Sequence, residues 1–343
     1  MKELLCKLIE IPSFSGQETA AADFLQGWLS SEGYQIHRCG NNLWMESEPS
    51  GAKPTILLNA HIDTVKPASG YTRDPFSPSI EGEYIYGLGS NDDGGSLVTL
   101  LETYKRLSAK PQAYRLVFSA TACEETGAAG GIDMVLSEAG RIDLGIIGEP
   151  TGMQMAVAEK GLMVLDCTAH GISGHAARNE GDNAIYKAMR DIEWFEGYHF
   201  DKVSDFFGQV QMSVTQINAG TQHNVIPDRC SFVVDIRSNG MYTNLEILDT
   251  VRRNVACEVT PRSTLHNGSS IEWNHPVVLR GRSLGLGSIG SPTFSNCAAC
   301  DFPTLKIGPG ESSRSHAADE YILTTEMEQA VNIYFRLLDG LKI

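Results

Sequence analysis

Histidine and acidic residues follow three apolar segments of this chain, and together they form a possible metal site. Residues 55–60 are followed by His61 and Asp63, and two later apolar segments end at Glu124–Glu125 and at Glu149. A metal-bound histidine usually passes its second ring nitrogen to an acceptor such as a carboxylate. His61 therefore suits a metal ligand with Asp63 behind it. The alternative is a surface histidine beside a loop aspartate.

Two further residues complete a set of five possible ligands. Asp92 lies in the glycine-rich segment 87–95, and His316 ends the segment 308–316. Two metal ions that share a bridging carboxylate need about five ligands, supplied by several strand ends or loops. Taken singly, Asp92 is also a plausible helix cap and His316 an ordinary loop histidine. The occurrence of all five residues at strand ends and in loops is unlikely by chance.

The elements that would position these residues alternate between strand and helix. Apolar runs predict buried strands at 55–60, 116–118 and 144–147, and helical spacing predicts helices at 97–107 and 327–338. Near the start, Ser15–Gly16–Gln17–Glu18 fits the capping box of a further helix. The alternation predicts a doubly wound α/β sheet, and such sheets place ligands at the carboxyl ends of their strands.

A second domain is predicted from about residue 157 to 264. Its elements follow the order β-α-β-β-α-β, which suggests a ferredoxin-like α+β insert. Residues 1–156 and 265–343 would then form the first domain. The predicted elements are a strand at 161–169, a helix that begins at Asn183, strands at 211–217 and 230–237, a helix capped by Thr243 and a strand at 258–262.

Composition narrows the classes of partner. The chain has 343 residues and a formal charge of −15, which argues against binding nucleic acid or acidic membranes. No apolar run reaches membrane-spanning length, and the first residues lack a signal-peptide core. The eight cysteines are scattered, as in a reduced cytoplasmic protein, and the lone Cys297–Cys300 pair has no second pair beside it. We expect a cytoplasmic protein.

The chain resembles the co-catalytic metallopeptidases and deacylases that include acetylornithine deacetylase and succinyl-diaminopimelate desuccinylase. The resemblance covers nearly the whole chain and is strongest for the branch that deacylates acetylornithine or succinylornithine. It implies a catalytic domain of the phosphorylase/hydrolase-like type with an inserted lid. It rests on Asn59–Val65, Gly87-x-Gly-x-x-Asp92, Glu124–Glu125, Gly148–Thr151, Gly174–Ala177, Gly220–Pro227, Arg237 and His316.

The resemblance implies a role for each possible metal ligand. Asp92 would bridge two zinc ions, for which cobalt can substitute. His61 and Glu149 would complete one metal site, and Glu125 and His316 the other. A non-proline cis peptide would follow the bridging aspartate.

The resemblance also implies the residues of catalysis and substrate binding. Glu124 would be the general base, and Asp63 would orient the first histidine ligand. The insert would form the interface of a homodimer, from which His175 reaches the partner's active site. Two residues of the insert would hold the substrate carboxylate: Asn224 and Arg237. The chain departs from many relatives at three positions, none of them a metal ligand: Leu88, Gly94 and Asn296.

The expected reaction is hydrolysis of the amide bond of an N-acyl amino acid. N-succinylornithine or N-acetylornithine would suit, in arginine biosynthesis. Arg314 and Arg178 lie close in sequence to the two loop histidines, and either could bind a second carboxylate, which favours the succinyl compound. Their alternative is a surface or dimer salt bridge. The alternatives for the whole protein are a dipeptidase or aminopeptidase on the same scaffold, or a catalytically silent binding protein.

Overall fold

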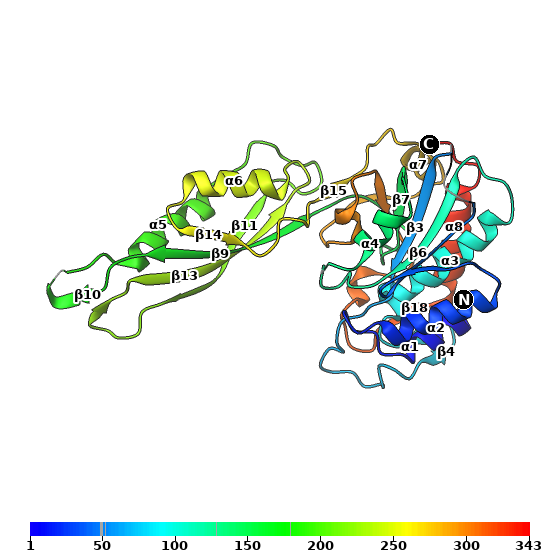
Figure 1. The fold of residues 1–343 in the computed structure, drawn as a ribbon, viewed down its shortest axis with the longest axis horizontal. Coiled ribbons are helices and arrows are strands. Elements are labelled where there is room, and N and C mark those ends of the chain that lie inside the picture. Colours follow the sequence, from blue (N-terminus) through cyan, green and yellow to red (C-terminus); the bar gives the residue numbers. More distant parts are fainter. Residues whose placement is uncertain (49–50, 52, 128, 179) are drawn as a thin grey trace. The chain divides into compact units, whose positions relative to one another are not determined.

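The computed structural model describes residues 1–48, 51, 53–127, 129–178 and 180–343, which form two compact units (Figure 1). The first unit comprises Met1–Val157, Ser270–Ile289 and Ser295–Ile343, and the second comprises Ala158–Ser269 with Gly290–Phe294. The second unit thus begins one residue later than the predicted insert, ends five residues later, and also includes residues 290–294.

Contacts of a short later segment explain why residues 290–294 belong to the second unit. The ring of Phe294 packs edge-on against His266 with centroids 4.6 Å apart, and the carbonyl of Ser291 accepts a hydrogen bond from the backbone of Lys160. Residues 290–294 therefore complete the second unit after the chain has already left it. Nothing in the composition of this segment marks such a return.

In the described residues, a nine-stranded mixed sheet forms the centre of the first unit. Its four central strands run parallel in the order β6-β3-β7-β17, so their carboxyl ends meet at one edge of the sheet. These strands are β6 (Arg115–Thr121), β3 (Thr55–His61), β7 (Leu144–Ile147) and β17 (Thr304–Lys306). The outer strands are β1 (His37–Cys39), β2 (Asn42–Glu46), β8 (Met155–Glu159), β15 (Ser269–Ser270) and β16 (Ser288–Ser291).

Helices cover both faces of this sheet, as predicted for a doubly wound fold (Figure 1). The strand alternation shows the two faces: Ile56 and Leu58 of β3 enter the larger core, whereas Leu57 enters the smaller one. The larger core is closed by α1 (Lys2–Ile9), α2 (Thr19–Ser31), α3 (Gly95–Ser108), α7 (Pro276–Ser283) and α8 (Thr324–Leu338). The smaller core is closed by α4 (Ile132–Glu138) and the short η3 (Asn296–Ala299).

A small three-stranded sheet ties two distant segments of the first unit together. It has the order β18-β5-β4, with β4 (Ser79–Glu81), β5 (Tyr84–Tyr86) and β18 (Tyr321–Leu323). The turn η1 (Ser90–Gly94) follows β5, and the turn η4 (Ser312–Arg314) precedes β18. No helix among the described residues is long and apolar enough to cross a membrane.

The second unit has the predicted ferredoxin-like fold. Its antiparallel sheet has the order β11-β13-β9-β14, and the helices α5 and α6 pack against it. Both helices begin at the predicted caps, because Asn183 accepts a hydrogen bond from the backbone of Ile185 and Thr243 forms a capping box with Glu246. The elements are β9 (Gly161–His170), α5 (Ala184–Gly197), β11 (Gln211–Ala219), β13 (Arg229–Ser238), α6 (Asn244–Asn254) and β14 (Glu258–Pro261). A two-stranded antiparallel sheet, β10 (Gly174–His175) with β12 (Val225–Ile226), and the turn η2 (Ala176–Arg178) complete it.

Candidate active site

Each of the four parallel strands leads a candidate ligand to the same edge of the sheet. His61 is the last residue of β3, Glu124 and Glu125 follow β6, and Glu149 follows β7. Strand β17 leads into the loop that carries His316. The structure therefore brings together residues that are up to 255 positions apart in the chain (316 − 61). The predicted convergence at the carboxyl ends of the strands is confirmed.

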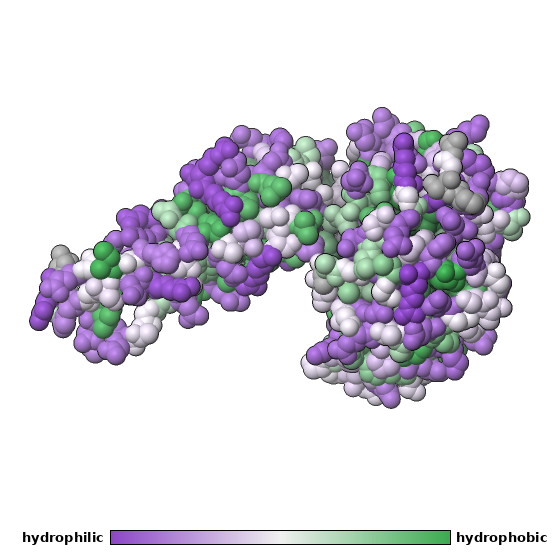
Figure 2. All heavy atoms as spheres, viewed as in Figure 1, coloured by the Kyte–Doolittle hydropathy of each residue, from purple (hydrophilic) through white to green (hydrophobic). Residues whose placement is uncertain are grey.

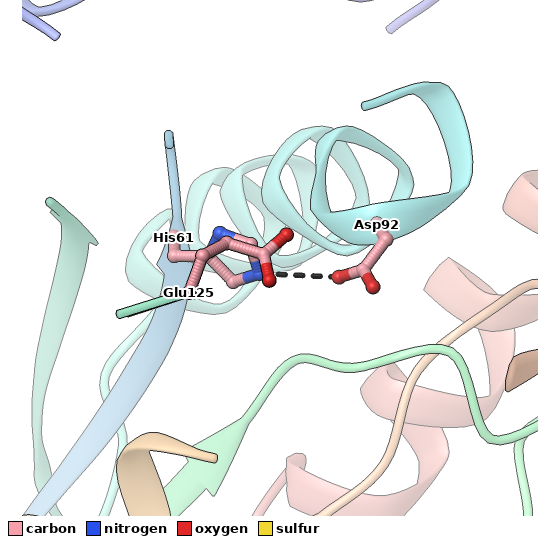
Figure 3. Close-up of side chains that lie close together, drawn as sticks. All are labelled: His61, Asp92 and Glu125. Carbon is pink, nitrogen blue, oxygen red and sulfur yellow. Dashed lines mark hydrogen bonds and ion pairs between the residues drawn. The ribbon is translucent and has the colours of Figure 1, made fainter. Parts of the chain in front are cut away.

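The carboxylate of Asp92 lies between two histidines. Its Oδ1 is 3.1 Å from Nε2 of His61, and its Oδ2 is 3.7 Å from Nε2 of His316. Figure 3 shows the imidazole of His61, at the end of β3, pointing at Asp92, with Glu125 beside it. Nε2 of His316 is also 2.9 Å from Oε2 of Glu125. The peptide bond between Asp92 and Asp93 is cis, as predicted.

His61 also belongs to a second group of possible ligand atoms. Side-chain atoms of His61, Glu124 and Glu149 come within 4.8 Å of one another. Nζ of Lys306, a buried residue of β17, is 4.0 Å from Oε2 of Glu149. The sequence analysis missed this lysine, although a charged residue inside the apolar segment Thr304–Ile307 was a usable signal.

Asp63 lies past the end of β3, so strand alternation does not carry as far as this residue. Nδ1 of His61 is 2.8 Å from the backbone carbonyl of Asp63, whereas it is 3.5 Å from the Asp63 carboxylate. A proton on Nδ1 satisfies the carbonyl and leaves Nε2 able to bind a metal. The carboxylate instead accepts hydrogen bonds from Ser15 Oγ at 2.7 Å and from the backbone amides of Glu124 and Glu125, each at 3.1 Å.

The predicted capping box at residues 15–18 is wrong. Helix α2 begins at Thr19 without a side-chain cap. The Ser15 hydroxyl is used by Asp63, and the buried carboxylate of Glu18 accepts hydrogen bonds from the backbone of Gly16 and Cys123. Both residues of the supposed cap therefore support the segments around the candidate ligands.

The site concentrates buried negative charge. Burial raises the pKa of Glu124 well above its usual value, and the neighbouring carboxylate of Glu149 raises it further. Burial alone would lower the pKa of His61, but its hydrogen bonds to Asp63 and Asp92 outweigh this and raise it well above its usual value.

The loop histidine shows the same effect of charge. A hydrogen bond to Glu125 raises the pKa of His316 to about 9. Carboxylate oxygens grouped with histidine nitrogens are a donor set that fits divalent metal ions.

The comparison with protein families agrees with this geometry. The sequence pattern of Peptidase family M20/M25/M40 matches residues 57–340. The chain belongs to this family. The resemblance seen in the sequence is thereby confirmed, and the protein is an enzyme of a metal-dependent class of hydrolases.

Individual members of the family are similar along almost the whole chain. Succinyl-diaminopimelate desuccinylase 2 of Ruegeria sp. (strain TM1040) is 26% identical over 98% of this chain and 93% of its own length. A tripeptidase of Staphylococcus aureus subsp. aureus mu50 has a TM-score of 0.76 at 21% identity, covering 98% of this chain and 96% of that one. A dinuclear metal binding peptidase of Bacillus subtilis has a TM-score of 0.71 at 17% identity, covering 98% and 95%. The two solved structures share the fold of this chain.

The two residues predicted to hold the substrate carboxylate, Asn224 and Arg237, lie in the second unit, before β13 and near its carboxyl end. His175 pairs with Val225, and the carbonyl of Asn224 accepts a hydrogen bond from the backbone of Ala176, so His175 and Asn224 adjoin each other at the small sheet of β10 and β12. Arg237 lies at the other end of β13 and forms two hydrogen bonds with Asp235. From Arg229 to Arg237 the strand spans roughly 26 Å (8 residues of about 3.3 Å).

Arg314, a predicted substrate-binding residue, forms a salt bridge in the structure. Its guanidinium forms two hydrogen bonds with Glu326, at 2.8 and 2.9 Å, and lies 4.5 Å from the ring centroid of Tyr321. This is the salt bridge that the sequence analysis kept as the alternative, and Glu326 lies too far along the chain for spacing to reveal it. Arg178, in the turn after His175, is exposed. Arg178 thus stays a predicted substrate-binding residue, whereas the guanidinium of Arg314 is held by Glu326.

Proposed function

We propose that the protein hydrolyses the amide bond of an N-acyl amino acid at a centre of two zinc ions. The observation that carries this proposal is the Asp92 carboxylate, with one oxygen near His61 and the other near His316. His61 and Glu149 would hold one ion, Glu125 and His316 the other, and Asp92 both. When bound, such ions polarise the amide carbonyl and lower the pKa of the attacking water. The similar Bacillus subtilis peptidase, described as dinuclear, supports the number of ions.

Glu124 is the proposed general base. It is buried beside the candidate ligands, and its Oε2 lies 3.9 Å from Nε2 of His61. A carboxylate there can take a proton from the attacking water and pass it to the leaving amine. The burial that raises its pKa makes it a stronger base than an exposed glutamate.

We propose that the active enzyme is a homodimer formed through the second unit. Asn224 and Arg237 lie too far apart in one chain to hold the same carboxylate, so one of them must come from a partner copy if both bind it. His175, beside Asn224, would then act in the partner's site and donate a hydrogen bond to the oxyanion that forms on the substrate. The edge strand β11 of the sheet is largely exposed, which offers a pairing edge to a second copy.

Exposed apolar side chains on the same unit support this interface. Tyr186 and Met189 of α5 are 65% and 56% exposed, and Leu245 of α6 is 63% exposed. Figure 2 shows apolar residues at the surface of this unit around α6. Burial of such side chains against a second copy would be favourable.

An N-succinyl amino acid is the proposed substrate class, with N-succinylornithine preferred over N-acetylornithine. The name of the Ruegeria relative supports the succinyl group, and the resemblance of the sequence motifs supports ornithine. This substrate would place the reaction in arginine biosynthesis in the cytoplasm. A peptide is the competing substrate, because the structurally similar protein of Staphylococcus aureus is described as a tripeptidase.

One assay separates these possibilities. The metal-free protein is reloaded with Zn²⁺ or Co²⁺ and supplied with succinylornithine, acetylornithine, succinyl-diaminopimelate and simple dipeptides, with Glu124→Gln protein as the control for contaminating activity. We expect hydrolysis that depends on added metal and the highest kcat/KM for succinylornithine. A higher kcat/KM for a dipeptide would make the protein a peptidase. Protein that binds two metal ions but hydrolyses none of these compounds would support the silent binding protein.

A further inference from the structure

The geometry points to Glu320 and Asn91 as positioning residues that hold Asp92 in register with His316. The inference rests on the proposed metal centre, in which Asp92 and His316 are ligands. These two ligands come from segments more than 200 residues apart in the chain, so other contacts must fix the distance between them.

The Glu320 carboxylate caps the turn that carries Asp92. Glu320 is 2% exposed. Its Oε1 accepts hydrogen bonds from the backbone amides of Asn91, at 2.8 Å, and Asp92, at 2.9 Å, and its Oε2 accepts one from Gly89 at 3.1 Å. The first amides of a helical turn have no partner within the turn, and η1 has no side-chain cap of its own. The distant glutamate therefore supplies bonds that the local sequence lacks.

The side chain of Asn91 makes the connection in the other direction. Its Oδ1 accepts a hydrogen bond from the backbone amide of Glu311 at 3.1 Å, and its Nδ2 donates to the carbonyl of the same residue at 3.1 Å. Nδ2 also donates to Ser315 Oγ at 3.2 Å. Gly310, at φ +79°, makes this fit possible, since a Cβ there would lie 2.1 Å from Asn91 Oδ1.

The two connections enclose His316. Asn91 holds Glu311 and Ser315 before the histidine, and Glu320 holds the turn of Asp92 from the far side of it. The pairing of β18 with β5 continues the attachment beyond Glu320. If the turn that carries Asp92 moved relative to the segment that carries His316, the hydrogen bonds between these two segments would break. The two ligands are therefore held near each other before a metal ion binds.

The proposed metal site of Glu125 and His316 should depend on these hydrogen bonds more than the site of His61 and Glu149. His61 and Glu149 are attached to β3 and β7 of the large sheet, whereas Glu125 and His316 lie in loops. Loss of an outer residue that orients metal ligands typically lowers metal affinity about 10- to 100-fold. We therefore expect removal of the Glu320 charge to weaken one of two bound metals selectively.

Glu320→Gln tests the inference with almost no change in side-chain size. The amide oxygen can keep the bonds to Asn91 and Asp92, but the amino group would face the N–H of Gly89. Asp191→Asn is the matched control. Asp191 is also buried, and its carboxylate accepts hydrogen bonds from two consecutive backbone amides, those of Ala256 and Cys257, each at 3.0 Å, within the second unit.

The readout is titration of the metal-free proteins with Co²⁺, followed by calorimetry and by the visible spectrum of the bound ion. We expect two ions per wild-type chain, an affinity for the second ion at least about tenfold lower in Glu320→Gln, an altered spectrum of that ion, and wild-type behaviour in Asp191→Asn. If Glu320→Gln does not fold, Asn91→Asp provides the same test, because it loses the two bonds donated by Nδ2.

Two results would contradict different parts of this account. The positioning role would be overturned if Glu320→Gln bound each ion as tightly as wild type does, or if Asp191→Asn lost as much affinity for the second ion as Glu320→Gln. Either result would leave the proposed metal centre intact. A wild-type chain that binds fewer than two Co²⁺ ions would instead overturn the proposed dinuclear centre, and the inference with it.

Discussion

The backbone amide of Glu124 donates a hydrogen bond to the carboxylate of Asp63 at a distance of 3.1 Å. Asp63 therefore anchors the proposed general base directly, while it contacts His61 mainly through its backbone carbonyl. The sequence resemblance implied only the orientation of the histidine. One buried residue thus supports two parts of the candidate site: its carbonyl contacts the first ligand, and its carboxylate holds the base.

Asp63→Asn should lower kcat about 10- to 100-fold, because an amide cannot accept all three hydrogen bonds that reach the carboxylate. The Glu124–Glu125 segment would lose its fixed position. Ser15→Ala is the control, since it removes one of the same three bonds but none to the backbone of Glu124 or Glu125, and it should cost only about 1 kcal/mol of stability. Steady-state kinetics and thermal unfolding of both variants check this. Equal kcat values for the two variants would contradict it.

Glu124→Gln and Glu125→Gln should have different defects. Glu124→Gln should lose roughly two or more orders of magnitude in kcat while it keeps both metal ions, because the general base is gone. Glu125→Gln should weaken one metal ion, because a proposed ligand loses its charge. Metal content after dialysis and kcat at saturating metal measure the two effects. The reverse pattern would exchange the two roles.

Metal affinity should rise with pH up to about 9. In the metal-free protein the hydrogen bond to Glu125 raises the pKa of His316 to about 9, so the histidine is protonated at neutral pH. A metal ion must displace that proton, so the affinity at this position should fall about tenfold for each unit of pH below the pKa. Calorimetry of Co²⁺ binding in buffers of different ionisation enthalpy should show release of at least one proton. Affinity that does not change from neutral pH to about 9 would contradict this.

Complementation between inactive chains tests whether His175 acts in the partner's site. His175→Ala and Glu124→Ala chains are each expected to be inactive. Mixed under subunit exchange, half the dimers pair one chain of each kind and hold one working site, so about a quarter of wild-type activity should return. A double variant carrying both substitutions, mixed with either chain, is the control and should restore nothing. Proven exchange without recovery would place His175 outside the partner's site.

The order of the elements and the convergence of the ligands could be predicted from the sequence. The apolar runs before His61, Glu124 and Glu149 are local patterns, and parallel strands bring their carboxyl ends together wherever they pair. The β-α-β-β-α-β order of the second unit was predictable for the same reason. These features depend on periodicity and connection order, which the chain displays directly.

The hydrogen-bond partners of these residues could not be predicted in this way. Ser15 and Glu18 have the spacing of a capping box, yet their side chains bond to segments 48 and 105 residues away. Likewise, the partner of Arg314 is Glu326, on a helix that follows a separate strand. Local spacing competes with tertiary contacts that have no trace in the local sequence, so such assignments depend on the folded structure.

The preference for a succinyl group should depend on Arg178 and not on Arg314. A charged hydrogen bond to the second carboxylate of succinylornithine is worth about 1.5–3 kcal/mol, or roughly 10- to 150-fold in kcat/KM. Arg178→Ala should therefore lose that factor for succinylornithine and leave kcat/KM for acetylornithine nearly unchanged. Arg314→Ala is the matched control: its guanidinium is held by Glu326, so its loss should lower the unfolding temperature and leave the ratio of the two kcat/KM values unchanged. A wild-type enzyme that prefers acetylornithine, or a ratio that changes only in Arg314→Ala, would remove Arg178 from the substrate site.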